Sequence, residues 1–83
     1  MPYDLPTPLY LTRRDAARNM ARFYVLSLEE TLFGEIALVR NWGRIGSAGQ
    51  MQRQTYDGRG AAVTVYQRLL KAKQRKGYRA PAA

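Results

Sequence analysis

Residues 35–46 of this 83-residue chain read EIALVRNWGRIG, and this stretch decides how the rest of the chain is arranged. Its first half is an apolar run of strand length, rich in β-branched and aliphatic residues and bounded by glycines, which predicts a β-strand. If the strand continues through the stretch, its side chains alternate between the two faces of the sheet. One face then ends in Trp42, the only tryptophan, with Arg40 and Arg44 on either side.

A tryptophan between two arginines suits a nucleotide. The flat ring can stack on a base or sugar, and guanidinium groups bind phosphate through paired hydrogen bonds. Gly43 has no side chain, so a ligand or another backbone segment can come close to it. A tryptophan on a strand of a small domain is also commonly a core residue with an arginine stacked over it. Trp42 and its neighbours alone leave both interpretations open.

The segments on either side of this stretch predict further strands joined by hairpins. Leu32 and Phe33 are apolar residues within the turn that closes at Gly34, and we expect them to fold back onto the core. Gly49, in the short connection after the central strand, is free to adopt a positive φ. The other predicted strands span residues 9–14, 20–28 and 50–56, with a polar connection at 15–19.

One helix is predicted after the last strand, over residues 61–76, with Asp57 as a candidate cap before it and Gly77 as its C-terminal glycine. The fold class is therefore α+β: an antiparallel sheet of about four strands with one C-terminal helix across one face. The apolar stripe predicts that Ala62, Tyr66 and Leu69 are buried, with Arg68 and Arg75 exposed. The domain spans 9–78, between a loose lead-in at 1–8 and a frayed tail at 79–83.

Composition narrows the function. The chain has no cysteine, no histidine and only six acidic residues, so we expect no metal, no cofactor, no small-molecule substrate and no catalysis. It has no long apolar run and no signal-peptide pattern, from which we expect a cytoplasmic protein without membrane insertion. The net charge of +8, with no acidic residue from Arg59 onward, favours a polyanionic partner, meaning nucleic acid or an anionic membrane surface.

The chain resembles the WGR domain family, in the form of a short bacterial-type protein. The resemblance runs from about Leu9 to Tyr78 and is carried by motifs in the family's order: Arg22-Phe23-Tyr24, Trp42-Gly43-Arg44-Ile45-Gly46, Gly49-Gln50, Ala62 with Tyr66, Lys73, and Gly77-Tyr78. It implies an antiparallel sheet with a helix on one face, and polynucleotide binding. Related domains in poly(ADP-ribose) polymerases contact DNA beside strand breaks.

The resemblance also implies roles for individual residues. Trp42 would pack on a sugar or base at a DNA end, Arg44 would lie beside it, Arg22 would contact the backbone, and Tyr78 would lie near a terminal phosphate. The predicted nucleic-acid-binding residues are Arg22, Arg40, Trp42, Gly43, Arg44 and Tyr78, with a secondary basic patch of Arg13, Arg14, Lys73 and Lys76. The alternative is a protein-interaction adaptor that uses the same Trp-Gly-Arg face.

Overall fold

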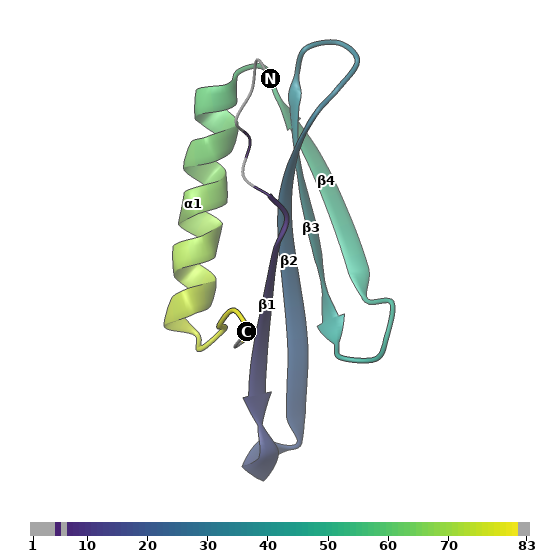
Figure 1. Ribbon diagram of the computed structural model, residues 1–83, viewed down its shortest axis with the longest axis vertical. Helices are drawn as coiled ribbons and strands as arrows, with labels where there is room; N and C mark the ends of the chain where they lie inside the picture. The colour runs from purple at the N-terminus through teal and green to yellow at the C-terminus, as the bar shows by residue number, and fades with distance from the viewer. Residues whose placement is uncertain (1–4, 6, 82–83) are drawn as a thin grey trace.

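A computed structural model describes residues 5 and 7–81 and shows a four-stranded antiparallel sheet with one helix against it (Figure 1). This confirms the predicted α+β class. The strands lie side by side in sequence order, and residues 1–4 and 6 of the predicted lead-in lie outside the described residues. The elements are β1 (Leu9–Asp15), the 3-10 helix η1 (Ala16–Arg18), β2 (Met20–Glu30), β3 (Ile36–Arg44), β4 (Gln50–Tyr56) and α1 (Arg59–Arg75).

The core lies between the sheet and α1. Tyr24 on β2 is paired with Leu11 on β1 and with Trp42 on β3, so these three side chains share the face that α1 covers. As predicted, Ala62 and Tyr66 are buried, whereas Arg68 and Arg75 are exposed; Leu69 is only half-buried. The buried cluster consists of Leu11, Tyr24, Leu26, Leu28, Ile36, Leu38, Ala62, Tyr66 and Tyr78.

Two glycines let the β3–β4 hairpin close tightly over Phe23. A Cβ atom on Gly43 would lie 2.7 Å from the Gly49 Cα, and a Cβ on Gly49 would lie 2.3 Å from the Trp42 carbonyl oxygen. Gly49 has a φ of +73°, as its place in the hairpin predicts. The sequence predicted that a ligand or another backbone segment comes close to Gly43. In the structure it is a backbone segment, the main chain of Gly49. The Phe23 ring, stacked on Tyr10 with centroids 6.3 Å apart, lies beneath both glycines.

The sequence predicted the C-terminal end of α1 better than its N-terminal end. The helix begins at Arg59, two residues earlier than predicted, and its N-cap is Gly58, which makes no side-chain hydrogen bond. The prediction of Asp57 as the cap was wrong. At the other end Gly77 has a φ of +98°, and its N–H donates to the Gln74 carbonyl. The Tyr78 N–H donates to the Lys73 carbonyl, which completes a Schellman motif.

The chain that follows α1 returns to the sheet. Thr12 on β1 and Arg79 exchange both backbone hydrogen bonds, each 2.8 Å long, in an isolated antiparallel bridge. The segment predicted as a frayed tail is therefore held at its first residue, although 82–83 lie outside the described residues. Leu5, within the predicted lead-in, is half-buried against the core.

The loop between β2 and β3 contradicts its prediction. Leu32 is 100% exposed and Phe33 is 88% exposed, so neither folds back onto the core. The turn is fixed by Thr31, whose hydroxyl accepts hydrogen bonds from the N–H groups of Phe33 and Glu35. Gly34 closes the turn with a φ of +81°. Because the local hydrogen bonds hold the backbone, the two apolar side chains are directed into solvent.

Candidate nucleic-acid interface

A cavity of about 430 Å³ opens where the C-terminal end of α1 meets the ends of β2 and β3. The sheet supplies its floor, and the helix and the segment after it supply one wall. Two aromatic rings and three cationic side chains border it, which gives a surface that can both stack on a ring and bind an anion. The lining residues are Arg22, Trp42, Gly43, Arg44, Lys73 and Tyr78.

Trp42 is half-buried, so it is neither a fully buried core residue nor a fully exposed stacking surface. One side of its ring packs against the hydrophobic core, and the residue also lines the cavity. The guanidinium carbon of Arg40 lies 5.4 Å from the ring centroid, a cation–π arrangement. Arg40 in turn donates a hydrogen bond to the side chain of Gln52 on β4. The indole is thus held in a fixed orientation by the core on one side and Arg40 on another.

Three arginines form a row across the sheet beside this cavity. Arg13 on β1 is paired with Arg22 on β2, and Arg22 is paired with Arg44 on β3. Paired residues point to the same face, and like charges directly opposite one another are destabilising. Within residues 5 and 7–81, the ion pairs of Arg18 with Asp15 and of Arg53 with Glu29 involve none of these three arginines, so the row is uncompensated there. The row is a site at which a bound anion would relieve repulsion between the three guanidinium groups.

Arg44 is positioned by a residue that the sequence reasoning did not select. Its Nη1 donates to the backbone carbonyl of Asn19 at 3.1 Å, and its Nη2 reaches the Asn19 side-chain oxygen at 3.5 Å. Asn19 follows η1 with a φ of 51°, a left-handed conformation that asparagine adopts more readily than most residues. The Arg44 guanidinium is therefore held by Asn19, whereas that of Arg40 stacks over the Trp42 ring.

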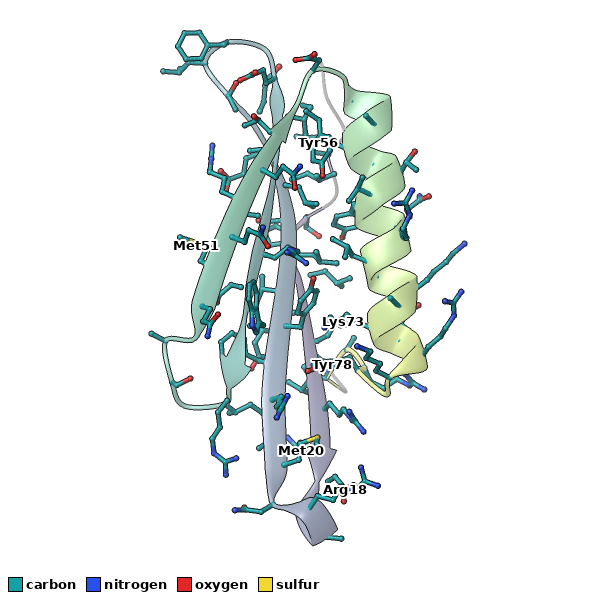
Figure 2. The ribbon with its side chains drawn as sticks, turned by 180° about the vertical axis from the view of Figure 1, so that it is seen from behind. Arg18, Met20, Met51, Tyr56, Lys73 and Tyr78 are labelled. Atoms are coloured by element: carbon teal, nitrogen blue, oxygen red, sulfur yellow. The ribbon has the colours of Figure 1, made fainter. Side chains whose placement is uncertain are left out.

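Lys73 extends from α1 toward the sheet, close to Tyr78 (Figure 2). Its ammonium nitrogen lies 4.5 Å from the centroid of the Tyr24 ring and 5.4 Å from that of Tyr78. Burial lowers the pKa of Lys73 below 10.5, and the nearby charges of Lys76, Arg40 and Arg22 lower it further. A bound phosphate would reverse that effect, because an adjacent negative charge favours the protonated amine.

Tyr24 lies in the core next to the cavity residue Tyr78. Burial raises the pKa of Tyr24 above 10.0, and the charge of Arg40 opposes that shift only in part. Tyr78 meets Tyr24 edge to face, with ring centroids 6.1 Å apart, and is itself buried. Arginine and lysine therefore determine the electrostatics of the cavity, with no acidic group among its lining residues.

The structure brings most of the predicted site residues together and places the others elsewhere. Five of the six primary residues line one cavity, and Lys73, placed in the secondary patch by prediction, joins them. Arg40 lies outside the cavity and acts through the Trp42 ring. Arg14 lies at a separate surface with Ala16 and Asn19, while Arg13 lies in the arginine row. Lys76 is the C-cap of α1. Only the strand register, which sequence spacing did not give, reveals the row.

The described residues contain neither a cluster of metal-binding side chains nor a membrane-crossing helix. Among residues 5 and 7–81, no group of three or more His, Cys, Asp or Glu side chains is placed to hold a metal ion. Within the same part of the chain, α1 and η1 lack the combination of length and apolar character that a membrane-crossing helix requires.

Comparison with known proteins identifies the family. The model of the WGR domain matches residues 7–83, almost the whole chain. A relative from Sinorhizobium fredii (strain NBRC 101917 / NGR234), named "Uncharacterized protein y4dW", is 47% identical over 74 residues, which cover 89% of this chain and 36% of the relative. The chain thus spans about a third of that relative's length. No solved structure matches the chain. The chain belongs to the WGR domain family.

Proposed function

We propose that this domain is a non-catalytic nucleic-acid-binding module, acting chiefly on DNA and largely independent of sequence. The observation that carries the proposal is the uncompensated row of Arg13, Arg22 and Arg44 beside a cavity with aromatic walls. A row of like charges weakens the free fold, and a polyanion is the ligand that offsets this repulsion. WGR domains are known in nucleic-acid-binding contexts, which agrees with this assignment.

The size of the cavity bears on the form of nucleic acid. At about 430 Å³ it is on the scale of a small-molecule site and suits one nucleotide rather than the side of a continuous duplex. Trp42 and Tyr78 would pack on the sugar or base, and the arginines and Lys73 would bind phosphate. We therefore propose ends, nicks and single strands as the preferred ligands, which a cytoplasmic protein would meet at the nucleoid.

The proposed lack of preference for a DNA sequence rests on the parts of the fold that supply the cavity residues. The cavity residues come from strand ends and from the C-terminal part of α1, and none of the residues that line the cavity is an Asn or Gln that would read base edges. Phosphate contacts position a protein on DNA, whereas base-edge contacts specify a sequence. The residues of this cavity supply contacts of the first kind.

The test is a salt titration of binding to single-stranded, blunt, nicked and closed circular DNA of the same sequence. Neutralisation of roughly four to six phosphates gives a log–log slope of about −4 to −5, with weaker binding to closed duplex. A slope near zero, or no binding at low salt, contradicts the proposal. That result would favour the alternative, a protein adaptor that uses the Trp-Gly-Arg face, because a contact anchored by an aromatic ring responds little to salt.

A further inference from the structure

The tip of the β2–β3 loop presents two large apolar side chains on a rigid support. Leu32 and Phe33 are almost completely exposed. The backbone beneath them is fixed, because the Thr31 N–H donates to the Glu35 carbonyl at 2.9 Å and the Gly34 N–H donates to the Thr31 carbonyl at 3.2 Å. Exposed apolar side chains on an ordered turn pay little conformational entropy on binding, so this tip has the properties of an interface anchor.

Four of the five acidic residues in the described part of the chain lie toward the tip, one of them, Glu29, in an ion pair with Arg53; Asp15 lies at the opposite end. The strand register places Glu30 next to Ile36, and Ile36 next to Tyr56, at the end of the sheet from which the loop projects (Figure 1). A surface that accepts this tip would combine basic groups with aliphatic side-chain stems against which Leu32 and Phe33 can pack. The acidic residues at this end are Glu29, Glu30, Glu35 and Asp57.

A surface with these properties lies at the other end of the molecule. A recess of about 410 Å³ near the C-terminal end of α1 is lined by Lys71, Gln74, Arg75 and Arg79. Arg79 is held in place there, because its Nη1 donates to the carbonyls of Gln74 and Tyr78. Lys71 and Arg75 are each two positions from Lys73, so they lie on the side of the helix turned away from the nucleic-acid cavity.

We propose that the Leu32-Phe33 tip of one copy of this domain docks into the Lys71-Gln74-Arg75-Arg79 recess of a second copy. The apolar side chains would lie against the aliphatic stems of the basic residues, with a guanidinium over the Phe33 ring. Glu30 and Glu35 would pair with the cationic rim. The 17 residues of α1 separate tip and recess by about 25 Å, so the tip cannot reach the recess of its own chain.

The contact joins two different surfaces, so a pair of copies held by one contact still offers a free tip and a free recess, and association continues past the dimer into open chains or rings. It is small, so association is weak and grows with protein concentration. It leaves the nucleic-acid cavity free and does not depend on the function proposed for that cavity. Copies bound to neighbouring sites on one strand would be brought together by the same contact.

The experiment is sedimentation velocity of the nuclease-treated, nucleic-acid-free protein over a wide concentration range at low salt. We expect the sedimentation coefficient to rise without a plateau at the dimer, and the association constant to fall at least about tenfold in Phe33→Ala. Met51→Ala is the matched control, because Met51 is 71% exposed on β4 and belongs to neither surface. Thermal unfolding checks that each variant is folded.

A mixing experiment tests the direction of the contact. Phe33→Asp removes the tip and Arg75→Glu removes the recess, so each variant alone should be monomeric. Their mixture should form one-to-one dimers that grow no further, since one intact tip and one intact recess remain. A monomeric wild type, association of Phe33→Asp like the wild type, or a monomeric mixture would overturn the proposal. Phe33-dependent binding of a monomeric wild type to phosphatidylcholine vesicles would assign the tip to a membrane instead.

Discussion

Replacing Arg22 with glutamine separates a ligand-binding role from a structural one, because the two roles predict opposite changes in stability. Arg22 is the middle member of the cross-strand row and faces both Arg13 and Arg44. Like charges in such pairs cost about 0.2–1 kcal/mol each, and the exposure of Arg22 and Arg44 places the cost at the lower end. Arg22→Gln should stabilise the free protein by about 0.5 kcal/mol, which raises its Tm by about 2–4 °C.

The same substitution should weaken nucleic-acid binding. Loss of one hydrogen bond to a charged phosphate costs about 1.5–3 kcal/mol, or roughly tenfold to 100-fold in Kd. The log–log salt slope should become shallower by about 0.9 on duplex DNA. Thermal unfolding and fluorescence anisotropy with labelled DNA in one buffer measure both effects, with Arg68→Gln, on the exposed side of α1, as the control. A lower Tm with unchanged affinity would refute the reasoning and make Arg22 a structural residue.

Three further substitutions test other parts of the site. Trp42→Ala should leave a folded protein that is less stable by roughly 2 kcal/mol, since the ring is only half-buried, and that binds DNA about 1–3 kcal/mol more weakly; unchanged affinity in folded protein would exclude stacking. Gly43→Ala should lower the Tm by about 5–20 °C, because its Cβ meets the Gly49 backbone, whereas Gly60→Ala in α1 should not lower it; equal Tm values for the two would contradict this packing. Because the pKa of Lys73 lies below 10.5 in the free protein and a bound phosphate raises it, affinity should fall as pH rises toward 10.5. Lys73→Arg should show a smaller fall, and parallel pH profiles would remove Lys73 from the phosphate site.

The sequence was sufficient for the elements and for most of the cavity. Strand alternation placed Arg40, Trp42 and Arg44 on one face, and the apolar stripe of the helix identified Ala62 and Tyr66 as buried residues. These features depend on local periodicity, which a single sequence shows directly.

Features that depend on register or on turn geometry were not predictable. The arginine row exists only because Arg13, Arg22 and Arg44 come into line, and a slip of one residue would turn each to the opposite face. The prediction that Leu32 and Phe33 fold back onto the core was wrong, because apolar composition does not reveal which way a turn directs its side chains. Asp57 failed as a cap because Gly58 already had the extended backbone that the helix start needs.

The bridge between Thr12 and Arg79 has a consequence for how the site can be observed. It ties the first strand to the residue that follows Tyr78, so these two hydrogen bonds help to hold Tyr78 at the cavity. Joining segments so distant in sequence carries a large loop-closure entropy, and this end of the domain is a natural place for local opening. Amide hydrogen exchange at Thr12 and Arg79 would then report the occupancy of the cavity, since a ligand that needs Tyr78 in place must slow the exchange of both.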